Sequence, residues 1–179
     1  MDKVARQVLW ASYACQDAVE ELYDGDSADN KINQQISILY EFVYCYLHLT
    51  MRTAFGLLTH PQIVKLQNHI GIVISTGIIE SYFASASVTT KFEMTREFFK
   101  NVDQAELEYT DIAASPQGET DEEKAANQLA SIFMRLGFRI AQFSDQPIDL
   151  SLRLVSRVAI EEWMKDEIGS ALVELRNTN

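Results

Sequence analysis

Apolar residues recur at spacings of three and four along most of the chain, which is the pattern of amphipathic α-helices. The stripe is clearest in the first segment, where it runs through Val4, Val8, Ala11 and Cys15. The same periodicity predicts six helices, over residues 2–23, 30–58, 61–87, 91–110, 120–143 and 149–175. No segment alternates in the way a half-buried strand does. We therefore expect an all-α fold, a single-domain bundle of five or six helices that are mostly antiparallel.

Turn residues separate the predicted helices. Residues 24–27 read Asp-Gly-Asp-Ser, and Pro61 follows the second helix, where it disfavours a helical conformation for the residue before it. Thr120 and Glu123 have the spacing of a capping box, which places the start of the fifth helix. Residues 103–123 contain eight acids and no base, and we expect an acidic mobile loop over residues 103–120.

The second predicted helix, residues 30–58, is apolar around most of its circumference. A helix of this kind lies centrally and contacts several neighbours. Its apolar face is wider than one neighbour covers, so we expect protein–protein contact, including self-association into a homo-oligomer.

The composition limits the classes of molecule that the chain is expected to bind. The 179 residues carry a net charge of −11, which opposes binding to nucleic acid and to an anionic membrane surface, and which favours a basic protein partner. The most apolar stretch, residues 70–79, is too short to cross a bilayer. Cys15 and Cys45 have no metal-binding spacing and resemble buried hydrophobes of a reducing compartment. With no signal peptide at the start of the sequence, we expect a cytoplasmic protein.

The first group of candidate site residues combines two carboxylates with two imidazoles. Glu41 and His48 share one face of the second helix, and His69 and Glu80 share one face of the third. If the two helices pack antiparallel across their short connection, these residues form adjacent Glu/Glu and His/His layers, which suit a divalent metal or a general acid–base pair. The alternative is that both stripes are narrow solvated faces. The Glu-x-x-His pattern of di-iron bundles and the HExxH motif are both missing from this sequence.

The second group is a set of four arginines. Arg135 and Arg139 lie one turn apart in the fifth helix, and Arg153 and Arg157 lie one turn apart in the sixth. In a hairpin centred near residue 146 the four occupy one level of the bundle. Arg153 and Arg157 also continue a line to Ile160, Met164, Ile168, Ala171 and Leu175, which we interpret as facing the core. Buried arginines need partners, so the cluster either pairs with carboxylates of the bundle or binds a small anionic ligand.

No catalytic motif is found in the sequence, and we predict no catalytic residue and no cofactor. These observations favour a non-enzymatic, cytoplasmic interaction or regulatory protein that acts through protein–protein contacts. Two alternatives remain open. One is a bundle, possibly an enzyme, that binds an anionic ligand or a divalent metal, and the other is an acidic inhibitor or immunity-type protein that docks onto a basic partner.

Overall fold

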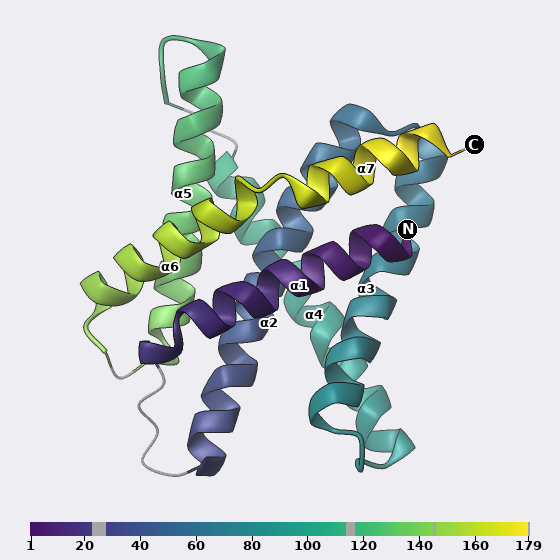
Figure 1. Ribbon diagram of the computed structural model, residues 1–179, viewed down its shortest axis with the longest axis vertical. Helices are drawn as coiled ribbons and strands as arrows, with labels where there is room; N and C mark the ends of the chain where they lie inside the picture. The colour runs from purple at the N-terminus through teal and green to yellow at the C-terminus, as the bar shows by residue number, and fades with distance from the viewer. Residues whose placement is uncertain (23–27, 114–116, 145, 179) are drawn as a thin grey trace.

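The computed structural model describes residues 1–22, 28–113, 117–144 and 146–178 and is helical throughout (Figure 1). Within these residues there is no strand, and a short 3₁₀ turn, Glu20–Leu22, follows the first helix. The helices are α1 (Asp2–Ala18), α2 (Ala28–Leu57), α3 (His60–Tyr82), α4 (Val88–Ala113), α5 (Asp121–Ala141), α6 (Ile148–Trp163) and α7 (Glu167–Asn177). The predicted all-α bundle is confirmed. Among the described helices, none is long and apolar enough to span a membrane.

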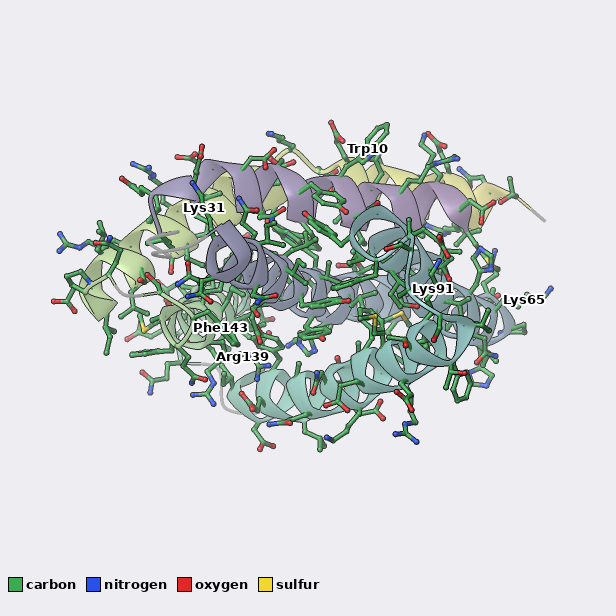
Figure 2. The ribbon with its side chains drawn as sticks, turned by 90° about the horizontal axis from the view of Figure 1, so that it is seen from below. Trp10, Lys31, Lys65, Lys91, Arg139 and Phe143 are labelled. Carbon is green, nitrogen blue, oxygen red and sulfur yellow. The ribbon has the colours of Figure 1, made fainter. Side chains whose placement is uncertain are left out.

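The second helix, α2, lies at the centre and is covered from several directions. Helices α1, α3, α4, α5 and α7 all pack against it, and Figure 2 shows α2 between α1 on one side and α4 on the other. Its fully buried apolar side chains are Ile38, Leu39, Phe42, Val43, Cys45, Tyr46 and Ala54. The wide apolar surface that suggested self-association is therefore used mainly for packing within the chain.

Tyr46 of α2 connects the core to α6. Its hydroxyl donates to the carbonyl of Ala159 at 3.1 Å, and its ring stacks on Trp163 with centroids 6.0 Å apart. The thiol of Cys15 in α1 lies 3.0 Å from the same hydroxyl. Cys15 and Cys45 are both free and buried, as the sequence predicts.

The last predicted helix is wrong in one respect, because the chain breaks into α6 and α7 at Asp166. This residue adopts a left-handed backbone conformation with φ of 56°, which aspartate tolerates better than most residues. A Cβ at Gly169 would meet the Asp166 carboxylate at 2.1 Å, so a larger residue there would require this side chain to turn away. The predicted core-facing line therefore does not stay on one face: Ile160 and Met164 are exposed, whereas the α7 members Ile168 and Ala171 are buried.

The predicted acidic loop over residues 103–120 is also wrong for its first half. Helix α4 continues to Ala113, because Ala105 and Tyr109 recur at helical spacing and are buried in the core. The exposed side of the same segment carries its acids. Residues 114–116 of the predicted loop lie outside the described residues, and the predicted capping box of Thr120 and Glu123 is present at the start of α5.

Helices α2 and α3 do not form the expected tight antiparallel pair. Figure 1 shows them meeting at their connection and diverging from there, while α1 and α4 each pack against both. The third helix ends at Tyr82, before the expected residue 87. Because α1 and α4 pack against both diverging helices, the polar groups of α2 and α3 face neighbouring helices instead of each other.

The packing of α5 on α6 predicts opposite effects for two glycine substitutions. A Cβ at Gly137 would lie 3.0 Å from the Cα of Leu152 in α6, whereas nothing lies within 4 Å of a Cβ at Gly56. Gly137→Ala should destabilise the chain by about 1 kcal/mol or more, since overpacking outweighs the gain in helix propensity. Gly56→Ala should stabilise it by about 0.5–1 kcal/mol. Urea unfolding of both variants measures the difference, and equal effects would contradict the close approach.

Candidate functional site

The predicted His/His layer does not form. His48 is buried, and its Nδ1 lies 2.8 Å from the Glu106 carboxylate of α4. His69 is partly exposed, and its Nε2 contacts the Asp2 carboxylate of α1. Because α2 and α3 diverge, the two imidazoles face different neighbours.

The predicted Glu/Glu layer is separated in the same way. Glu80 is exposed and pairs with Lys91 of α4 at 2.9 Å. Glu41 is buried and pairs with Arg139 of α5. In the described part of the chain, no group of three or more His, Cys, Asp or Glu side chains is arranged to hold a metal ion. The four predicted metal ligands therefore lie in four separate polar contacts.

The four predicted arginines divide into two pairs on different sides of the α5–α6 hairpin. Gly137 faces α6, and it lies two residues from both Arg135 and Arg139. Two residues correspond to about 200° around a helix, so both arginines point away from α6. Arg153 and Arg157 lie exposed on the outer surface of α6, where Arg153 Nε donates to the carbonyl of Asp149 at 3.2 Å. The predicted core-facing side of Arg153 and Arg157 is wrong, because both side chains are exposed.

Arg135 and Arg139 do take part in a built polar site. Arg139 donates from Nε and Nη2 to both carboxylate oxygens of Glu41, the latter bond being 3.1 Å, and its Nη1 lies 2.9 Å from Glu108 Oε2. Arg135 donates to the same Glu108 oxygen from Nε at 3.1 Å and from Nη2 at 2.8 Å. We call the alternating series Glu41, Arg139, Glu108 and Arg135 the charge ladder.

The charge ladder runs from the core to the surface. The exposed fraction of the side chain rises from 8% at Glu41 and 13% at Arg139 to 25% at Glu108 and 44% at Arg135. Each inner member contacts groups of the opposite sign on either side. At the outer end, the Nη1 group of Arg135 makes no hydrogen bond to any residue that the structure describes. The ladder therefore presents an open guanidinium edge at the surface.

The two carboxylates of the charge ladder are perturbed in opposite directions. Burial raises the pKa of Glu41 above its ordinary value, although the hydrogen bonds and the charge of Arg139 act against it. Burial also acts to raise the pKa of Glu108, but the hydrogen bonds from Arg135 and Arg139 outweigh it and lower the pKa. Burial therefore disfavours the charged form of Glu41, whereas two guanidinium partners stabilise the charged form of Glu108.

The charge ladder forms one wall of a pocket where α2, α4 and α5 meet. The pocket has a volume of about 460 Å³, and Figure 2 shows Arg139 and Phe143 near each other between α2 and α4. The other walls carry uncharged polar and aromatic side chains. These are Ser37, Tyr40, Tyr44, Asn101, Gln104, Gln142 and Phe143.

Aromatic packing fixes the α2 wall of the pocket. The rings of Tyr40 and Tyr44 stack with centroids 5.9 Å apart, and both contact the buried ring of Phe98. The Tyr44 side chain hydrogen-bonds Asn101 of α4, and burial raises the pKa of this phenol, so it stays a neutral donor and acceptor. These contacts hold α2 and α4 in a fixed relation across the pocket.

Sequence reasoning identified three of the four charge-ladder residues, but it assigned them to two different sites. It missed Glu108, because this residue fell in the segment expected to be a loop. The available signal was the helical spacing of Ala105, Tyr109 and Ile112, which places Glu108 beside a buried stripe.

Comparison with protein-family models, with curated proteins and with solved structures finds no match to this chain. The function must therefore be argued from the site itself. The charge ladder, the neutral polar walls and the fixed tyrosines suit recognition of a small molecule by hydrogen bonds and charge.

The buried pair of the charge ladder predicts a contrast between single and double substitution. Arg139→Ala should cost about 3–5 kcal/mol of unfolding free energy, because it leaves Glu41 buried without a charged partner. Replacing both residues, as Glu41→Leu with Arg139→Met, should change the stability little or increase it. The control Arg153→Ala, at an exposed arginine, should stay within about 0.5 kcal/mol of the wild type. Urea unfolding tests this, and a double variant as unstable as Arg139→Ala would contradict it.

The lowered pKa of Glu108 predicts a pH dependence. A carboxylate whose pKa is lower in the folded state contributes stability above its ordinary pKa, here 4.5, and loses the contribution as the pH falls through the folded value. Glu108→Gln should therefore be less stable than the wild type at pH 7, and the difference should shrink as the pH falls below about 4.5. Unfolding curves between pH 7 and pH 3 measure this. A difference that is constant with pH would contradict the role given to the two arginines.

Proposed function

We propose that this chain is a binding protein for a small polar molecule carrying an oxyanion group, which enters the pocket between α2, α4 and α5. The observation that carries the proposal is the outer end of the charge ladder. Charges alternate along the ladder, and the last member, Arg135, offers an open guanidinium edge at the pocket. The next position in the series suits a carboxylate or a phosphate, which a guanidinium recognises with directed hydrogen bonds.

The buried part of the charge ladder supports a binding role over a stabilising one. Taking Glu41 and Arg139 out of water costs several kcal/mol per ion in general, and their attraction returns this only when the geometry is good. Apolar side chains at the two positions would stabilise a bundle at least as well. The pair does, however, hold Glu108 and hence Arg135 in place at the pocket wall. It thus prepares the open edge of Arg135 for a ligand.

The pocket also suits the body of such a ligand. A volume of about 460 Å³ lies within the range of roughly 300–1,000 Å³ usual for small-molecule sites. Asn101, Gln104 and Gln142 supply amide donors and acceptors, and Ser37 supplies a hydroxyl. Hydroxyl or amide groups on the ligand would find partners there, while Tyr40 and Phe143 offer apolar ring surface.

Probes that differ only in the oxyanion group test the proposal. Thermal unfolding is measured with succinate and glycerol phosphate, and with their uncharged counterparts succinamide and glycerol. At least one oxyanion should raise the Tm of the wild-type chain more than its counterpart does. Arg135→Gln should weaken this binding by about 10–100-fold, the value of a charge-assisted hydrogen bond.

Arg157→Gln is the matched control for this experiment. It removes the same charge from an exposed arginine of α6 that forms no ion pair within the described residues. We expect it to bind the oxyanion as the wild type does. An equal loss in both variants would show a general charge effect, and no response of the wild type to any oxyanion would contradict the proposal.

A further inference from the structure

A second hollow lies beside the pocket, along the seam between α4 and α5. It has a volume of about 450 Å³ and is lined by Asp111 and Ile112 of α4 and by Met134 and Phe138 of α5. A further hollow of about 420 Å³ shares Ile112 and Met134 and continues along α5 to Asn127. We call the two together the α4–α5 groove. It follows α5 for about three helical turns, a length of roughly 16 Å.

The floor of the α4–α5 groove is apolar and open to solvent. The side chains of Met134 and Phe138 are 54% and 43% exposed, although both belong to large apolar residues. Ile112 of α4, which lines the same groove, is partly buried and packs on the core. Exposed apolar side chains are common singly, but a row of them along a groove is typical of a surface that another helix covers.

The α4 wall of the groove is acidic. Residues 103–113 contain four acids and no Lys or Arg, and two of the four, Glu108 and Asp111, line the groove. Glu108 already pairs with two arginines, whereas Asp111 is exposed and forms no ion pair among the described residues. Asp111 therefore leaves an unpaired negative charge at this wall, and a molecule bound in the groove should place a basic side chain beside it.

The net charge of the chain decides between two kinds of occupant. A second copy would also carry a charge of −11, and two such chains repel each other at long range. A basic segment of another protein is attracted instead. A groove about three turns long between two helices matches the apolar face of a short amphipathic helix.

We propose that the α4–α5 groove binds an amphipathic helix of a partner protein, with apolar residues against Met134 and Phe138 and a Lys or Arg beside Asp111. The α4–α5 groove adjoins the ligand pocket, and Arg135 and Glu108 line both. The inference does not depend on the proposed ligand, because it rests on the apolar floor and the acidic wall of the groove.

Fluorescence anisotropy with two model peptides tests this proposal. The probes are a labelled amphipathic helix of about 15 residues built from Leu and Lys and a matched helix built from Leu and Glu, both near physiological salt, where long-range attraction is screened. We expect the wild-type chain to bind the Leu/Lys peptide at least tenfold more tightly than the Leu/Glu peptide. Met134→Ser combined with Phe138→Ser should weaken binding of the Leu/Lys peptide at least tenfold, with no change in net charge.

Two matched controls separate the groove from general attraction to an acidic protein. Trp10→Ser removes an aromatic side chain that is 62% exposed on the opposite side of the molecule (Figure 2), and it should leave binding unchanged. Asp111→Asn should weaken binding more than Asp103→Asn, which removes the same charge from the same helix outside the groove.

Equal binding by the wild type and the double serine variant would overturn the proposal, since the peptide would then be held by net charge alone. Sedimentation of the chain without peptide supplies a second test. A dimer that the two serine substitutions dissociate would show that the occupant is a second copy, and it would overturn the partner that we assign.

Discussion

The covering of α2 is the constraint on which the rest of the structure depends. Helices α1, α3, α4, α5 and α7 pack against it, α6 contacts it at Tyr46, and its apolar side chains are buried around most of the helix. Burial of this extent is the main favourable contribution to folding, and it fixes where the surrounding helices lie. Any polar side chain on α2 that is buried in this way is removed from water and must find its partner on whichever helix covers it.

Glu41 and His48 show this consequence directly. Both are nearly inaccessible on α2, and both take a charged partner from another helix. Glu41 takes its partner from α5 and His48 takes its partner from α4, so two long-range polar contacts of the chain originate on an unusually apolar helix. The charge ladder is thus an outcome of the packing: Glu41 requires Arg139, and Arg139 in turn positions Glu108 near the surface.

The sequence was sufficient to locate most of the helices, but it did not show which neighbour each helix face contacts. Periodicity located the elements and the central position of α2, because one helix shows its own buried stripe in its own residues. The break at Asp166 was missed, because neither Gly nor Pro stands at that residue and aspartate adopts the left-handed backbone conformation only occasionally. The Glu/His layers do not form because α2 and α3 diverge, and each of the four residues pairs with α1, α4 or α5 instead. The charge ladder was predicted only in part. Its members come from three helices, so no spacing along one helix relates them.

The ligand that we propose would approach a chain whose net charge is −11, and at long range this charge opposes the binding of an oxyanion. The repulsion by the net charge acts at long range, whereas the contacts with the pocket residues act only at short range. At physiological salt the field of exposed charges is screened over about 8 Å, so the net charge mainly slows the approach of the ligand. At the pocket wall the four charges of the ladder cancel, and Arg135, whose guanidinium has an open edge, is the most exposed of the four. For the proposed ligand we therefore expect a low net charge, as in a zwitterion or a singly charged acid, because such a molecule meets little long-range repulsion and still offers Arg135 an oxyanion.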